Sequence, residues 1–137
     1  MKQTSDVNAS TPPTTLYGIP NCDTVKKART WLEQHQVPVQ FHDFKKQGLQ
    51  REIVKSWLQQ IPLDLLINRK GTTWRALSEE QKAIANDEDS AIDLMLSAPS
   101  LIKRPVLQMN IGDAARYQVG FKPEHYQQLF SISTESL

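Results

Sequence analysis

The chain has 137 residues, the size of one ordinary domain, and it is long enough to bury a core without disulfides or a metal. Its 16 Lys and Arg residues nearly balance its 15 Asp and Glu residues, and the net charge of +1 gives no electrostatic basis for a nucleic-acid or membrane partner. No long apolar run predicts a membrane span, and one cysteine cannot form a disulfide within the chain. We therefore expect a cytoplasmic location. A monomer is the expected state.

The first elements read as strand, loop, helix and strand. Thr15 to Ile19 is a short β-prone run that Pro20-Asn21 closes. Apolar residues then recur at helical spacing, at Val25, Ala28 and Leu32. Val37-Pro38 ends this helix, and a second strand runs from Val39 to Asp43. A strand-helix-strand opening favours a parallel pair of strands.

The middle of the chain, about residues 48–98, reads as a block of helices. One helix is marked by apolar residues on a single face, at Ile53, Val54, Trp57, Leu58 and Ile61. Ser78-Glu79-Glu80-Gln81 has the form of a capping box and predicts the start of another helix. This block is longer than an ordinary loop, so we interpret it as an insertion.

The last part of the chain reads as a hairpin and a helix. Val106 to Met109 and Ala115 to Val119 are β-prone runs, and Asn110 to Asp113 between them reads as a turn. Pro123 occupies a favourable first position of a final helix. The order of elements is therefore β-α-β, a helical block, and β-β-α.

We expect one domain with two tails. Residues 1–13 are rich in Ser, Thr, Asn and Pro and predict a flexible tail. The domain is expected to span residues 14–130, and a polar, frayed tail is expected at 131–137. The fold class is α/β.

Three separated segments resemble the arsenate-reductase-like family, which includes the ArsC, Spx and YffB proteins. They are Leu16 to Ala28, Asn68 to Arg75, and Ile102 to Leu107. The sequence looks closest to the YffB-type branch. The resemblance implies a thioredoxin-like fold with a helical insertion between its halves, and it implies a catalytic cysteine.

Cys22 is the candidate nucleophile. It lies after the first strand and directly before a helix, where unpaired backbone N–H groups and the positive end of the helix dipole favour a thiolate over a thiol. A lone cysteine is more often a small buried hydrophobic residue, but this placement points to chemistry. Val25 stands where a C-x-x-C motif has its second cysteine. An external thiol such as glutathione or a glutaredoxin is therefore expected to reduce any oxidised form of Cys22.

The resemblance also implies an anion site. Arg69 and Arg104 match two arginines that bind the oxyanion and the cysteine adduct in arsenate reductases, and a guanidinium can hold two oxygens of arsenate or a glutathione carboxylate. Lys26 lies one helical turn beyond the cysteine and is a third candidate for the anion site. Arg75 and Lys103 are weaker candidates. Each of these residues, taken alone, reads as an ordinary solvated side chain.

Pro105 matches the position at which thioredoxin folds keep a cis-proline, so a cis Arg104–Pro105 bond is predicted. The match to arsenate reductases is incomplete. Gly18 and Lys26 stand where those enzymes have a histidine and an arginine, and Val119 to Phe121 offers no third arginine. These departures put arsenate turnover in doubt.

The predicted function is a thiol-dependent oxidoreductase that acts on an oxyanion or disulfide, with glutathione as cosubstrate and no permanently bound cofactor. Arsenate is the substrate that the resemblance names. No spacing of His, Cys, Asp or Glu predicts a metal site. One alternative is an Spx-like regulator that binds RNA polymerase, although its usual C-x-x-C switch is absent here. Another is a glutathione-binding protein with little turnover.

Overall fold

The computed structural model describes residues 14–111 and 114–135, and these form two compact units. One unit consists of residues 14–43 and 104–135 and contains the sheet. The other is the insertion Phe44–Lys103, which is wider at both ends than the predicted 48–98. None of the helices in the described part of the chain is long and apolar enough to cross a membrane.

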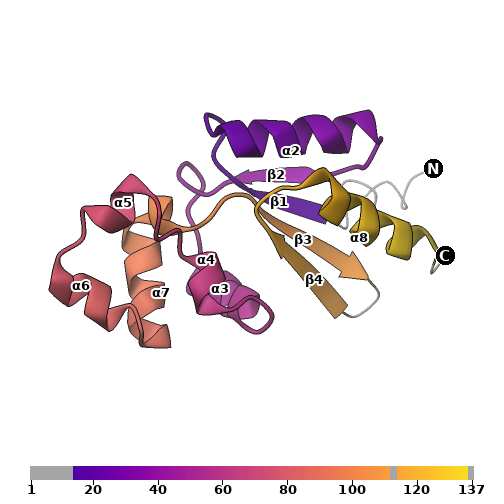
Figure 1. Cartoon of the computed structure of the whole chain (residues 1–137). Helices are drawn as coiled ribbons and strands as arrows, with labels where there is room; N and C mark the ends of the chain where they lie inside the picture. Colours follow the sequence, from indigo (N-terminus) through magenta and orange to yellow (C-terminus); the bar gives the residue numbers. More distant parts are fainter. Residues whose placement is uncertain (1–13, 112–113, 136–137) are drawn as a thin grey trace. The chain divides into compact units, whose positions relative to one another are not determined.

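The sheet unit has the predicted β-α-β and β-β-α halves (Figure 1). Its elements are β1 (Thr14–Gly18), α2 (Asp23–Gln34), β2 (Gln40–Asp43), β3 (Val106–Ile111), β4 (Ala114–Val119) and α8 (Pro123–Glu135). The four strands are ordered β2-β1-β3-β4. The predicted parallel pair is confirmed for β1 and β2, and β1–β3 and β3–β4 are antiparallel. This is the thioredoxin-like α/β arrangement.

The strand register brings three segments to one end of the sheet. Tyr17 of β1 pairs with Val106 of β3, and Val106 pairs with Val119 of β4. The chain therefore leaves β1, enters β3 and leaves β4 at the same end, which we call the Tyr17 end.

Helices α2 and α8 cover one face of the sheet, and residues of both helices pack with residues of the sheet in one core. The buried residues of this core are Leu16, Val25, Ala28, Leu32, Leu107, Met109 and Tyr126. The predicted helical stripe on α2 is confirmed, since all three of its members are fully buried. Trp31 of α2 meets the ring of Tyr126 edge-on, with centroids 5.5 Å apart. Burial raises the pKa of the Tyr126 hydroxyl above its usual value.

The insertion is helical, as predicted. It contains α3 (Arg51–Leu58), α4 (Leu63–Leu66), α5 (Thr72–Arg75), α6 (Glu79–Ile84), α7 (Glu88–Ser97) and a 3₁₀ turn at Pro99–Leu101. Helix α3 contacts α7, and both α5 and α7 contact the 3₁₀ turn. The predicted capping box is confirmed: the Ser78 hydroxyl accepts from the Gln81 N–H at 3.1 Å, and the Gln81 side chain accepts from the Ser78 N–H at 3.0 Å.

Two element boundaries differ from the predictions by more than one residue. Strand β3 continues through Asn110 and Ile111, which pair with Ala115 and Ala114, because ladder pairing outweighs the turn preference of asparagine. Helix α8 continues to Glu135, beyond residue 130 at which the domain was expected to end. Once a helix has formed, each added residue gains a backbone hydrogen bond, even in a polar stretch. The predicted N-terminal tail and residues 136–137 lie outside the described residues.

Gly18 ends β1 at a point where α2 passes very close. A Cβ added to Gly18 would lie 2.8 Å from Cγ2 and 3.3 Å from Cγ1 of Val25. Both methyl groups are attached to the same fully buried, β-branched side chain, so rotating it does not clear the space. The absence of a side chain at this position is therefore a packing requirement of the loop that precedes Cys22.

We predict that Gly18→Ala lowers the free energy of unfolding by about 1–3 kcal/mol, the usual cost of overpacking a core. In a Val25→Ala background the added methyl group has room, so the same change should cost less than about 0.5 kcal/mol. Denaturant unfolding of the two single variants and the double variant measures this coupling. Equal costs in both backgrounds would show that Val25 is not the obstacle.

Candidate active site

Cys22 is the N-cap residue of α2. Its backbone is extended, with φ −96° and ψ 127°, and its carbonyl accepts the first helical hydrogen bond from the Lys26 N–H at 2.9 Å. Its own N–H donates to the Ile19 carbonyl at 3.4 Å, which closes the tight turn after β1. The thiol is partly buried against the sheet core and accepts no capping hydrogen bond from the helix. Its sulfur therefore lies at the first turn of α2, where backbone N–H groups favour negative charge.

The charged side chains nearest to Cys22 in the sequence have opposite effects on a negative charge at its sulfur. Lys26 is exposed one turn into α2, where its ammonium group can approach an anion at the helix start. Asp23 is also exposed, and it occupies the first turn. The Asp23 carboxylate is stabilised by the same helix N-terminus as a Cys22 thiolate would be, and its negative charge repels that thiolate. Sequence reasoning did not weigh Asp23, although its position beside Cys22 was the signal.

A second segment at the Tyr17 end carries Arg104 and Pro105. The Arg104–Pro105 peptide bond is cis, the isomer that was predicted. The Pro105 carbonyl accepts a hydrogen bond of 2.8 Å from the N–H of Gly120, and Gly120 has φ 76°, a value that favours glycine. The Arg104 side chain is partly buried, including its Nε atom. Register and hydrogen bonding thus place Arg104 at the sheet end from which the cysteine loop leaves.

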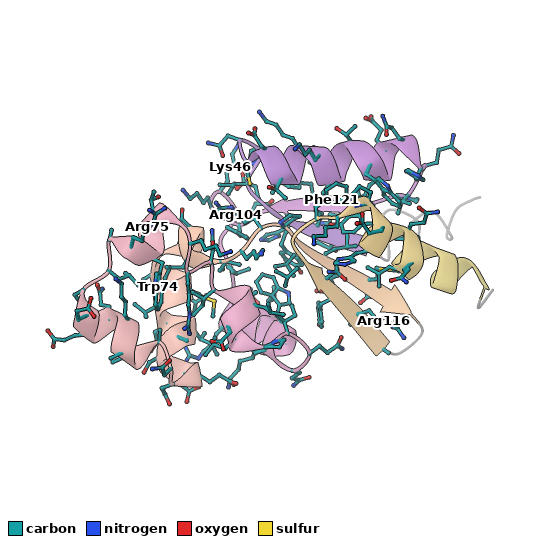
Figure 2. The ribbon with its side chains drawn as sticks, in the orientation of Figure 1. Lys46, Trp74, Arg75, Arg104, Arg116 and Phe121 are labelled. Atoms are coloured by element: carbon teal, nitrogen blue, oxygen red, sulfur yellow. The ribbon has the colours of Figure 1, made fainter. Side chains whose placement is uncertain are left out.

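The remaining predicted basic residues lie in the insertion. Arg69 forms an ion pair with Asp64, with Nη2 and Oδ1 2.9 Å apart, and its guanidinium lies 5.1 Å from the centre of the Trp74 ring. Arg75 donates to the carbonyl of Lys70 at 2.9 Å, so one of its nitrogens supports this loop. Figure 2 labels Trp74 and Arg75 on α5. How Arg69 relates to Cys22 stays a prediction from the resemblance.

Lys103 ends the insertion with an exposed side chain. Its N–H donates to the carbonyl of Leu66 at 2.8 Å, beside the isolated bridge between Ile67 and Ile102. Its contribution to an anion site also stays a prediction. In the described residues, no group of three or more His, Cys, Asp or Glu side chains is arranged to hold a metal ion.

Known proteins match nearly the whole chain. The sequence profile of the ArsC family matches residues 17–129. Among solved structures, the YffB (PA3664) protein is 50% identical with a TM-score of 0.76, and the match covers 84% of this chain and 96% of that one. An arsenate reductase (ArsC) related protein from Brucella melitensis is 48% identical with a TM-score of 0.64, with 85% and 93% covered. The global transcriptional regulator Spx from Streptococcus pneumoniae is 30% identical over 112 residues, which is 80% of each chain.

We predict that Asp23→Asn speeds the alkylation of Cys22 by iodoacetamide at neutral pH, whereas Lys26→Met slows it. Each change should be about threefold, because unit charges about 6 Å apart in water interact by about 0.7 kcal/mol. Salt at 1 M should shrink both effects through screening. Lys27→Met, which removes an exposed lysine one residue further along α2, is the matched control. Identical rates for all variants would contradict a thiolate controlled by local charge.

Proposed function

This chain belongs to the ArsC family, and on that premise we propose that it is a glutathione-dependent thiol oxidoreductase whose nucleophile is Cys22. One observation carries the proposal: the partly buried Cys22 is the N-cap of α2, at the sheet end where Pro105 precedes β3. A cysteine that only packs in the core requires neither solvent access nor the backbone N–H groups of a helix start. A nucleophile needs access together with donors that stabilise its charge.

The reaction is a pair of thiol–disulfide exchanges. The Cys22 thiolate attacks one sulfur of a disulfide, which forms a new S–S bond and releases the other sulfur as a thiolate that takes a proton from water. A glutathione thiolate then attacks the adduct, forms a disulfide with its sulfur and returns Cys22 as a thiolate. When the substrate is a glutathione mixed disulfide, Cys22 takes its glutathione part, one added glutathione thiol then displaces Cys22, and the two glutathiones leave as one disulfide while the other thiol of the substrate leaves reduced.

The reductant must come from outside the chain. The sequence contains one cysteine, and Val25 follows at the position of a resolving thiol. Reduction of an adduct on Cys22 therefore requires glutathione or a glutaredoxin, both of which are kept reduced in the cytoplasm. We propose this compartment as the site of action. Glutathione is then a cosubstrate rather than a bound cofactor.

Basic side chains are proposed to recognise the anionic substrate. Arg104 lies next to the cis-proline, Lys26 lies one turn into α2, and Arg69 is assigned from the resemblance. Each can hold a carboxylate of glutathione or an oxygen of an oxyanion through a charge-assisted hydrogen bond. Arsenate is the oxyanion substrate to test first.

A regulator of the Spx kind is the second candidate, because one relative with that name is 30% identical over four fifths of both chains. In that case the fold serves contact with RNA polymerase. The absence of a second cysteine in this chain counts against redox control of such contact. Binding to purified RNA polymerase, with and without a glutathione adduct on Cys22, separates this candidate from the enzyme.

We predict that oxidised glutathione adds a single glutathione to the protein and none to Cys22→Ser, as measured by intact mass. Arg104→Ala should slow the addition at least about fivefold, since charge-assisted hydrogen bonds contribute about 1.5–3 kcal/mol before solvent screening reduces them. Arg116→Ala is the matched control. Arg116 pairs with Met109, which pairs with Thr14, so it lies at the opposite end of the sheet, and Figure 2 labels both arginines.

Two outcomes contradict this assignment. If Cys22 reacts no faster than a free cysteine peptide, the thiol is not activated. If Arg104→Ala and Arg116→Ala slow the reaction equally, Arg104 acts only through overall charge. Rapid adduct formation without turnover in the presence of reduced glutathione supports a glutathione-binding protein instead of an enzyme.

The Asp64–Arg69 pair allows a gain-of-function test. Both side chains are exposed, so the pair adds little stability, and the guanidinium is already occupied by a carboxylate. If Arg69 binds glutathione, Asp64→Asn releases it and should speed glutathione addition about two- to fivefold. In an Arg69→Ala background the same change should have no effect. An equal acceleration in both backgrounds would mean that Asp64 repels glutathione by itself.

A further inference from the structure

The segment that follows β4 contributes an aromatic residue to the Tyr17 end of the sheet. Phe121 comes two residues after Val119, the residue that completes the Tyr17–Val106–Val119 row. Gly120 between them donates its N–H to the carbonyl of cis-Pro105 at 2.8 Å. Phe121 is therefore fixed beside the segment that carries Arg104, and Figure 2 labels both residues.

Phe121 lies on the same face of the sheet as Cys22. Both side chains are partly buried and pack against the core that α2 and α8 share. The Phe121 ring meets Tyr126 edge-on, with centroids 4.8 Å apart and an interplanar angle of 85°. Because Tyr126 is fully buried, it holds one side of the phenyl ring in place, while Phe121 as a residue stays partly exposed.

This environment has a consequence for the choice of substrate. A phenyl surface offers no hydrogen bond, so a small, multiply charged oxyanion gains nothing from it and loses water on that side. An apolar group attached to a disulfide sulfur gains from the same contact, at about 25 cal/mol for each Å² removed from water. The Tyr17 end of the sheet thus has one cationic side chain, Arg104, and one apolar side chain, Phe121, for contact with a substrate.

We propose that Phe121 is a specificity-determining residue that selects mixed disulfides between glutathione and a thiol bearing an apolar group. This inference rests on the proposed function of Cys22. Arg104 takes a glutathione carboxylate, and Phe121 contacts the apolar group of the other thiol. The Cys22 thiolate attacks the glutathione sulfur, and the apolar thiol leaves as a thiolate that is protonated by water. A second glutathione then releases Cys22 and forms the disulfide of glutathione.

The test compares two mixed disulfides of glutathione, one with benzyl mercaptan and one with 2-mercaptoethanol. These thiols have similar acidity, so they differ mainly in apolar surface. We expect kcat/KM of the wild-type protein to be about fivefold higher for the benzyl substrate, as burial of about 40 Å² of apolar surface implies. Rates for a free cysteine peptide with both disulfides provide the chemical baseline.

Three variants identify the residue responsible. Phe121→Ala should reduce the preference to the chemical baseline, and Phe121→Leu, which keeps most of the apolar volume, should retain part of it. Phe130→Ala is the matched control, because Phe130 also contacts Tyr126 but lies about one turn beyond it on α8. It should leave the preference unchanged. Circular dichroism checks that each variant is folded.

Either of two results overturns the inference: a wild-type protein without preference above the baseline, or a preference that survives in Phe121→Ala. A third result separates the inference from its premise. If neither disulfide reacts faster with the wild-type protein than with Cys22→Ser, the proposed function itself fails, and the assignment of Phe121 fails with it.

Discussion

The register of three strands is the constraint on which the candidate site depends. Tyr17, Val106 and Val119 form one row across β1, β3 and β4. Because β3 is antiparallel to both neighbours, this row brings together the ends of β1 and β4 and the start of β3. Cys22 lies in the segment after β1 and Phe121 in the segment after β4, while Arg104 and cis-Pro105 directly precede β3. A shift of one residue in this register would turn the side chains of the shifted strand to the other face of the sheet and displace the segment attached to that strand.

Close packing fixes the geometry of the cysteine loop. Gly18 touches Val25 of α2, so the strand and the helix approach each other as closely as their backbones and one valine allow. The turn between them is closed by the hydrogen bond from Cys22 to Ile19. The thiol is thereby held at the start of α2, where the helix favours negative charge, Asp23 opposes it and Lys26 supports it. Reactivity depends on the balance of these effects.

The sequence predicted most of the fold because its signals were local. Apolar spacing on α2, the β-prone runs and the Ser78–Gln81 capping box each depend on neighbouring residues, and each was confirmed. Boundaries were less predictable: β3 extends through Asn110 because its partner strand supplies hydrogen bonds, which local preference does not register. For the candidate site, the predicted place of Cys22 directly before a helix is confirmed, because Cys22 is the N-cap of α2, while its role as a nucleophile stays a proposal. The contacts of Phe121 with Tyr126 and of Asp64 with Arg69, on which two of the proposals rest, were not predicted, because residue spacing does not encode them.

The central claim is that Cys22 turns over through a covalent adduct that external glutathione resolves. Steady-state reduction of a glutathione mixed disulfide, measured at several concentrations of both reactants, tests it most directly. A covalent intermediate predicts ping-pong kinetics, with parallel double-reciprocal lines and no activity in Cys22→Ser. Intersecting lines, or a rate in Cys22→Ser equal to that of the wild-type protein, would contradict it.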